Sequence, residues 1–147
     1  MDISKIDQSV IDSLNKIKTP FARISIFIVY FWFGTLKLFG LSPASPLVEN
    51  LLTQTLPFIR FNDFILLLGV FEILIGVGFL FPKLTRVMTI ALFAHMITTA
   101  LPLILLPQIT WSGFLVPTLE GQYILKNVLI IALAVVIGSS LPPLNKR

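Results

Sequence analysis

Four ionisable residues fall inside long apolar stretches of this sequence: Lys37, Glu72, His95 and Lys126. A charged side chain within a lipid bilayer is costly unless it is paired, hydrated or able to reach the headgroups, so such residues are candidates for function. They comprise two ammonium groups, one carboxyl group and one imidazole, which are groups that exchange protons and donate hydrogen bonds. Of these, the imidazole changes charge nearest to neutral pH.

Glu72 lies near the middle of its apolar stretch, too far from either end for a short side chain to reach the headgroups. Gly69 and Gly76 fall on the same helical stripe, three residues before it and four after. Small residues on such a stripe allow a second helix to approach closely, so Glu72 is expected to face the interior of a helical bundle. There it would be protonated and hydrogen-bonded, or ionised and paired with a cation. The alternative to a functional role is a buried salt bridge that only fixes helix register.

His95 is similarly central in the next apolar stretch, and the residues on its helical stripe are small or polar: Ala91, Thr98 or Thr99, and Pro102. We therefore expect His95 on an interior face, either as a hydrogen-bonded core histidine or as a functional one. Pro102 removes a backbone hydrogen-bond donor, which predicts a kink in the outer third of this helix.

Two lysines lie nearer to the ends of their stretches. Lys37 shares a stripe with Tyr30 and Arg23, whereas Lys126 lies one turn into the last stretch, beside Asn127. Either lysine could simply extend to the outer headgroups, and Tyr30 could serve only packing. The functional hypothesis is one outward-facing polar cavity, whose ligand-binding candidates are Lys37, Glu72, His95, Lys126, Tyr30 and Asn127.

The composition excludes a water-soluble enzyme. Hydrophobic residues make up 56% of the 147 residues and charged residues only 12%, with a mean hydropathy of +0.94. These polar residues are too few to cover the surface of a soluble domain, and the same composition excludes disorder. The net charge of +4 contains no basic run beyond the last two residues, so no nucleic-acid partner is expected.

The scarcity of cysteine and histidine limits the possible chemistry further. The chain has no cysteine and one histidine, so it cannot by itself supply an iron–sulfur cluster or a multi-histidine metal site. We therefore expect no metal site. Enzyme activity stays open, but an enzyme acting on its own is not expected.

Four stretches are long and apolar enough to cross a bilayer, which takes about 20 residues of helix. Strand-like alternation is absent, so the sequence predicts an all-α integral membrane protein, a four-transmembrane-helix bundle over residues 20–142. The expected spans are residues 21–39, 64–81, 87–106 and 123–141.

Residues 1–19 are polar but carry apolar residues at three- and four-residue steps, namely Ile3, Ile6, Val10, Leu14 and Ile17. This pattern predicts an amphipathic interfacial helix lying on the membrane, with Lys5, Lys16 and Lys18 toward water and headgroups. A helix packed on the cytoplasmic end of the bundle is the alternative. No cleaved signal peptide is expected, because no short apolar core precedes the first span.

Basic residues set the expected orientation, since cytoplasmic loops are enriched in Lys and Arg. With the N-terminus inside, eight basic residues fall on the inner side and three on the outer side. Arg23, Lys83 and Arg86 then lie at the inner ends of the spans, and residues 143–147 form a basic cytoplasmic tail. We expect a protein of the cytoplasmic membrane with both termini in the cytoplasm.

The loops carry three further signals. Residues 40–63 are too long for a simple turn, and Ser45 as an N-cap followed by Pro46 predicts a short helix on the outer surface. Residues 82–86 form a tight turn, so the second and third spans should be antiparallel neighbours. Trp111, beyond the third span, is typical of an anchor at the membrane interface.

Several short motifs resemble those of the DoxX-like superfamily of small four-helix membrane proteins. They are Arg23 opening the first span, GTLKL at residues 34–38, GVFEILIG at residues 69–76 and LKN at residues 125–127. Within that superfamily, LSPASPLV at residues 41–48 and the stretch 117–126 look most like the subfamily of the reactive-chlorine-resistance protein RclC. The resemblance covers residues 20–140, nearly all of the membrane part.

The resemblance implies a link to oxidative or reactive-chlorine stress, and other relatives are small subunits of quinone-coupled sulfur oxidoreductases. Without its own redox centre, this chain would need a bound quinone or a partner subunit. The leading hypothesis is therefore a ligand- or quinone-binding membrane subunit. A structural or assembly protein whose intramembrane charges only fix packing is the alternative, and a small transporter or ion pathway is third. Expected partners are the lipid bilayer, a redox partner subunit and a second copy of the chain.

Overall fold

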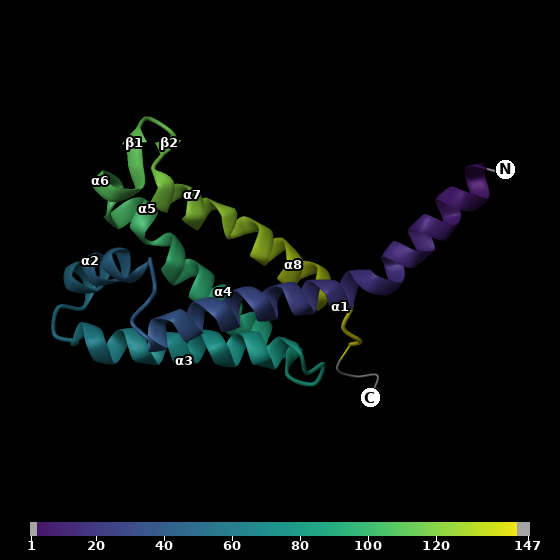
Figure 1. The fold of residues 1–147 in the computed structure, drawn as a ribbon, viewed down its shortest axis with the longest axis horizontal. Helices are drawn as coiled ribbons and strands as arrows, with labels where there is room; N and C mark the ends of the chain where they lie inside the picture. The colour runs from purple at the N-terminus through teal and green to yellow at the C-terminus, as the bar shows by residue number, and fades with distance from the viewer. Residues whose placement is uncertain (1–2, 144–147) are drawn as a thin grey trace.

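A computed structural model describes residues 3–143, which form a bundle of long helices with a small hairpin at one end (Figure 1). Most of the expected basic tail, residues 144–147, lies outside the described residues, as do residues 1–2. The elements in chain order are α1 (Ile3–Leu38), α2 (Ser45–Thr55), α3 (Phe61–Phe79), α4 (Thr85–Ala100), α5 (Pro102–Leu105), α6 (Pro107–Thr110), β1 (Trp111–Gly113), β2 (Val116–Pro117), α7 (Leu119–Lys126) and α8 (Val128–Ser139).

Four helical segments are long and apolar enough to cross a membrane, and each contains most of one predicted span. They are Ile3–Leu38, Phe61–Phe79, Thr85–Leu105 and Leu119–Ser139, the last two joining α4 to α5 and α7 to α8. Large apolar side chains are exposed along them, as on surfaces that meet lipid tails. The structure thus has the character of the helical membrane bundle that the sequence predicts.

Helix α1 is central to the packing. It runs along α3 and also contacts α8, while α4 contacts both α3 and α8. Side chains from all four segments meet in one apolar core, composed of Ala22, Ile26, Tyr30, Ile75, Phe79, Leu92, Met96, Ala134 and Ile137.

Three glycines bring α1 and α3 into backbone contact. A methyl group built on Gly34 would lie 2.6 Å from the carbonyl oxygen of Gly69, and one on Gly69 would lie 2.9 Å from that of Gly34. A methyl group on Gly76 would lie 3.0 Å from Cβ of Tyr30. The prediction that Gly69 and Gly76 admit a second helix is confirmed, and that helix is α1.

The N-terminal residues do not form a helix separate from the first span. Helix α1 runs unbroken for 36 residues, about 54 Å at 1.5 Å per residue, with Pro20 inside it. Figure 1 shows its N-terminal part leaving the bundle at an angle. Pro20 has no backbone N–H to donate, so one hydrogen bond is missing within α1, but the helix continues past it. Ile3, Val10 and Leu14 are exposed there, and their placement on a membrane surface stays a prediction.

The helix expected in the first long loop is present as α2, but its start differs from the prediction. Ala44 is the N-cap, and Ser45 is already helical with no capping hydrogen bond from its side chain. The hydroxyl of Ser42 instead accepts a hydrogen bond from the Ala44 backbone N–H at 3.3 Å. Pro46 does occupy the first turn of the helix, as expected.

Pro102 divides the third segment, in agreement with the expected kink. Helix α4 ends at Ala100 and α5 begins at Pro102, since proline cannot donate its backbone hydrogen bond into the preceding turn. Side chains beyond the break satisfy carbonyl groups near it. The Thr110 hydroxyl donates to Leu106 O at 3.1 Å, and Trp111 Nε1 donates to Leu103 O at 2.9 Å. The indole N–H of Trp111 therefore bonds within the protein, and its role as an anchor at the membrane interface stays a prediction.

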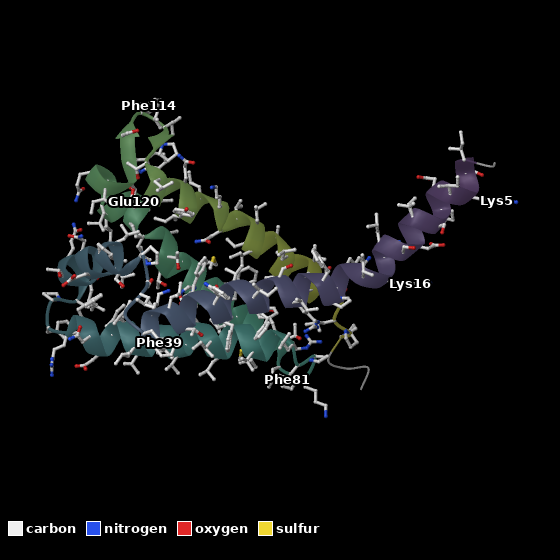
Figure 2. All side chains as sticks on the ribbon, viewed as in Figure 1. Lys5, Lys16, Phe39, Phe81, Phe114 and Glu120 are labelled. Atoms are coloured by element: carbon white, nitrogen blue, oxygen red, sulfur yellow. The ribbon has the colours of Figure 1, made fainter. Side chains whose placement is uncertain are left out.

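A two-stranded antiparallel hairpin joins the third and fourth segments, which the sequence analysis did not predict. Strand β1 pairs with β2 through Trp111 with Pro117 and Gly113 with Val116. Leu115 adopts a positive φ of 56°, unusual for a residue with a branched side chain. Figure 2 shows Phe114 at the tip of this hairpin, where its side chain is 93% exposed.

At the opposite end of the bundle, Arg23 joins three helices. Its Nη1 donates to Phe79 O at 2.8 Å and to the Thr85 hydroxyl at 2.6 Å, which lie at the end of α3 and the start of α4. Arg86 donates to Pro142 O, beyond α8. Because Lys83 lies in the α3–α4 turn, the structure places Arg23, Lys83 and Arg86 at one end.

The glycine contacts predict a selective effect of one added methyl group. We expect Gly34→Ala to lower the free energy of unfolding by about 1–3 kcal/mol, because the methyl group would collide with the backbone of α3. Unfolding in mixed detergent and SDS, followed by circular dichroism, measures this. Gly138→Ala is the control, since a methyl group there meets nothing within 4 Å. Equal stability of the two variants would contradict the close packing.

Candidate functional site

Lys37 and Glu72 form an ion pair inside the bundle. Lys37 lies on the last turn of α1 and Glu72 in the middle of α3, with Lys37 Nζ 2.6 Å from Glu72 Oε2. Lys37 is 5% exposed and Glu72 is 6% exposed, so neither charge reaches the surface of the bundle. The expectation that Glu72 faces the interior is confirmed. Of the two states left open by the sequence, this contact favours an ionised carboxylate paired with a cation.

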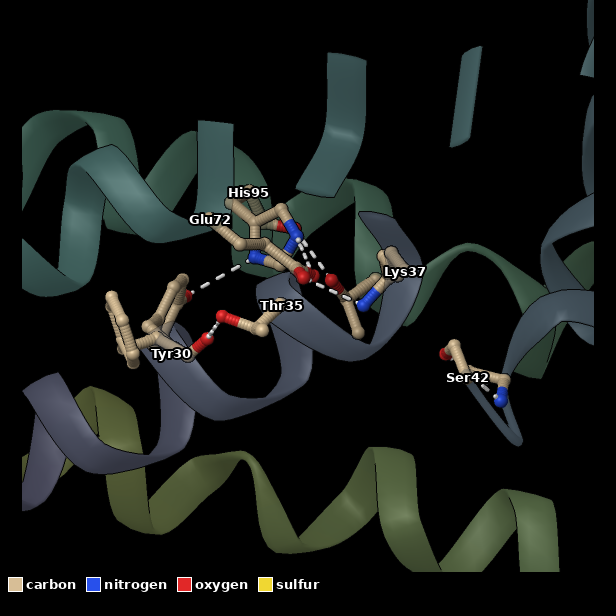
Figure 3. A network of polar contacts seen from close by, with 9 residues as sticks. Tyr30, Thr35, Lys37, Ser42, Glu72 and His95 are labelled. Atoms are coloured by element: carbon tan, nitrogen blue, oxygen red, sulfur yellow. Dashed lines mark hydrogen bonds and ion pairs between the residues drawn. The ribbon is translucent and has the colours of Figure 1, made fainter. Parts of the chain in front are cut away.

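His95 extends this pair from a third helix, α4. Its Nε2 lies 3.2 Å from Glu72 Oε1, and its Nδ1 lies 3.1 Å from the hydroxyl of Tyr30 on α1. Figure 3 shows the resulting chain of contacts, in the order Tyr30, His95, Glu72, Lys37. We call these four residues the polar cluster.

The chemistry of the contacts assigns the direction of each hydrogen bond. An ionised carboxylate only accepts, so Lys37 Nζ and His95 Nε2 both donate to Glu72. In a neutral imidazole the other nitrogen then carries a lone pair, and His95 Nδ1 accepts from the hydroxyl of Tyr30. Lys37 and His95 thus donate directly to the carboxylate of Glu72 on α3. Tyr30 donates to the far side of the His95 ring and so acts on that carboxylate through the imidazole.

The other residues on the predicted stripe of His95 do not join the polar cluster. The hydroxyls of Thr98 and Thr99 both donate to the backbone carbonyl of His95 at 2.8 Å. The ring of Phe71 lies beside the imidazole instead, with 6.1 Å between ring centroids. Sequence reasoning missed Phe71, because nothing in its spacing distinguishes it from the other twelve phenylalanines.

Lys126 and Asn127 are not brought to the polar cluster. Lys126 is exposed, and its Nζ lies 5.3 Å from the centroid of the Tyr123 ring. Helix α7 buries Gly121 and Ile124, so Lys126 faces away from the bundle. Asn127 is half-buried at the junction of α7 and α8. Of the six ligand-binding candidates, the structure therefore joins four.

The polar cluster is satisfied by its own contacts. Among the described residues, no buried side-chain nitrogen or oxygen lacks a hydrogen-bond partner. Two hollows on the described surface are lined by residues that do not belong to the polar cluster. One of about 550 Å³ lies between α2 and the α5–α6 region, and one of about 360 Å³ lies on α7 and α8 beside Lys126. A ligand at the cluster would have to replace one of the internal contacts.

Comparison with models of protein families, with curated proteins and with solved structures found no match to this chain.

The ion pair predicts that a single substitution lowers stability more than the double substitution that removes both charges. Glu72→Gln keeps an acceptor for His95 but leaves the Lys37 charge buried and unpaired, which should lower the free energy of unfolding by roughly 3–5 kcal/mol. Lys37→Met combined with Glu72→Gln should recover most of this loss. Unfolding in mixed detergent and SDS measures the stability of the wild type, the single variant and the double variant.

Lys126→Met is the matched control, because this lysine is exposed and should change stability by less than about 0.5 kcal/mol. A double variant no more stable than Glu72→Gln would show that Lys37 and Glu72 are not energetically coupled.

Proposed function

We propose that this chain is a ligand-binding membrane subunit whose polar cluster receives the headgroup of a quinone or a similar small carbonyl compound. The observation that carries the proposal is the buried Lys37–Glu72–His95 contact within apolar helices. Ionisable groups at membrane depth are rare and are commonly found where an ion, a proton or a polar ligand is handled. The cluster also supplies what such a ligand needs, namely convergent donors and a group that accepts a proton.

The two donors that meet at Glu72 are suited to a carbonyl oxygen. Lys37 Nζ and His95 Nε2 approach the same carboxylate, from 2.6 Å and 3.2 Å. A quinone oxygen could take the place of one carboxylate oxygen and accept from one or both donors. Glu72, released from that contact, would take up a proton and pass it to the ligand oxygen as the ligand is reduced.

The proposed location is the cytoplasmic membrane, with both termini of the chain in the cytoplasm. Support comes from the gathering of Arg23, Lys83 and Arg86 at one end of the bundle, opposite to Lys37, α2 and the hairpin. In this orientation Lys37 lies in the outer part of the membrane. The hollow between α2 and α5–α6 then opens on the outer side and is lined by polar side chains that include Glu49, Asn50 and Gln54.

The biological setting of this proposal comes from the resemblance to DoxX-like proteins. Defence against oxidative or reactive-chlorine stress is the role that this resemblance suggests. Because the chain has no cysteine and its one histidine lies in the polar cluster, electrons would come from the ligand itself or from a partner subunit.

Ligand binding predicts a defined loss of affinity. The double variant Lys37→Met with Glu72→Gln removes one charged donor, worth about 1.5–3 kcal/mol, so affinity should fall roughly ten- to hundredfold. Titration of the purified protein with a short-chain ubiquinone analogue, followed by intrinsic fluorescence quenching, measures this. Lys126→Met should bind as the wild type does. Absence of saturable binding to wild-type protein would refute the proposal for quinones.

A structural role is the second candidate, and the complete internal satisfaction of the polar cluster favours it. The ion pair links α1 to α3 beside the glycine contact, and His95 links both to α4. Contacts of this kind fix helix register without any ligand. In this case the bundle would serve as a platform for a partner subunit or for a second copy of the chain.

Survival under hypochlorous acid separates the two candidates. In cells that lack this chain and need it to survive, the folded double variant should restore survival if the charges only fix packing. It should fail to do so if the charges bind a ligand. Immunoblots of the membrane fraction would confirm equal amounts of each variant, and Lys126→Met should restore survival in both cases.

A further inference from the structure

We propose that Tyr30 is a one-electron donor that quenches peroxyl radicals in the membrane, with His95 receiving the phenolic proton. The inference goes beyond the proposed function, because it needs no bound ligand and no partner subunit. It rests on the arrangement of a phenol, an imidazole and a carboxylate in one line of hydrogen bonds.

A phenol gives up an electron much more readily when a base takes its proton at the same time. The radical cation that a phenol forms on losing an electron is a very strong acid, so oxidation without proton transfer is unfavourable. The hydroxyl of Tyr30 lies 3.1 Å from His95 Nδ1, within hydrogen-bond distance of a basic nitrogen. The two rings meet edge to face, with 5.4 Å between centroids. The proton therefore has a short path that does not require water.

Glu72 makes the imidazole a suitable base. Its Oε1 lies 3.2 Å from His95 Nε2, so a positive charge formed on the ring would be stabilised by a carboxylate. Lys37 stays paired with the other oxygen of Glu72 at 2.6 Å. The order of groups is that of a hydroxyl, histidine and carboxylate triad, with a redox-active phenol in place of an aliphatic hydroxyl.

The step balances in electrons and protons. One electron passes from the phenol of Tyr30 to a peroxyl radical, which becomes a peroxide anion. That anion takes a proton from water at the membrane surface and leaves hydroxide there. The O–H bond of Tyr30 breaks, and its proton forms a new N–H bond at His95 Nδ1. The products are a neutral phenoxyl radical, an imidazolium, a hydroperoxide and a hydroxide ion, so charge and protons balance.

The surroundings of Tyr30 suit a long-lived radical. Its side chain is 3% exposed and belongs to the apolar core, where Ile26, Ile75 and Met96 also lie. Burial keeps two phenoxyl radicals from coupling to each other, whereas an electron can tunnel to or from the ring through the apolar side chains around it. Figure 3 shows the hydroxyl of Tyr30 directed at the imidazole.

The chain offers one matched control, because its two tyrosines are Tyr30 and Tyr123. Tyr123 is 62% exposed, and its ring faces the ammonium group of Lys126. An ammonium group cannot accept a proton and disfavours loss of an electron from the ring beside it. The inference therefore assigns the radical to Tyr30.

The experiment uses the full chain in liposomes of saturated phosphatidylcholine, without added quinone. A lipophilic azo initiator supplies peroxyl radicals, samples are frozen at intervals, and electron paramagnetic resonance detects tyrosyl radicals. We expect the signal in the wild type and in Tyr123→Phe, and its loss in Tyr30→Phe. An equal signal in Tyr30→Phe, or no tyrosyl signal in the wild type, would overturn the inference.

His95→Gln tests the path of the proton. Gln can hold the hydroxyl of Tyr30 by a hydrogen bond but cannot take its proton, so the radical yield should fall sharply although the fold is retained. Thermal unfolding in detergent verifies the fold. A yield equal to that of the wild type would contradict the role of His95. Quinone titration is independent of this assay, so ligand binding and radical formation can fail separately.

Discussion

The ion pair between Lys37 and Glu72 is the interaction on which the rest of the structure depends. A carboxylate in the middle of an apolar helix is stable in its ionised form only beside a positive charge. For Lys37 Nζ to lie 2.6 Å from Glu72, α1 and α3 must run in close contact. Glycine at positions 34 and 69 allows that contact, because a methyl group at either position would strike the opposite backbone. Charge pairing and backbone packing therefore stabilise the same register of the two helices.

The remaining contacts follow from that register. His95 on α4 uses the second oxygen of Glu72 and connects it to Tyr30, so that three helices share one polar chain within an apolar core. At the opposite end, Arg23 bonds to Phe79 O and to Thr85 and joins the same helices again. Helix α1 is thus fixed to α3 and α4 at both ends of the bundle. Contacts at both ends of the bundle therefore hold the helices that carry Tyr30 and His95 against each other.

Of the four residues that the sequence singled out for their cost in a bilayer, Lys37, Glu72 and His95 belong to the polar cluster and Lys126 does not. Tyr30 completes the cluster. Interior placement of Glu72 was predictable, because Gly69 and Gly76 mark the same face of its helix. The choice between Lys37 and Lys126 as its partner was not, because both lie at similar depth and only the rotation of each helix decides. Helix α7 buries Gly121 and Ile124, which turns Lys126 outward. The hairpin also escaped prediction, since strands of three and two residues are too short for alternation to be visible.

The distribution of the two charges along the chain bears on how the protein enters the membrane. Segments are inserted in the order of synthesis, so α1 reaches the bilayer before the residues of α3 have been made. Lys37 lies on the last turn of its helix and has a long side chain, which can extend to the headgroups until Glu72 arrives. Glu72 has a short side chain near the middle of its helix, so it could not reach the headgroups if it entered the bilayer before its partner. With the cation on the earlier segment and the carboxylate on the later one, neither charge is stranded in lipid during synthesis.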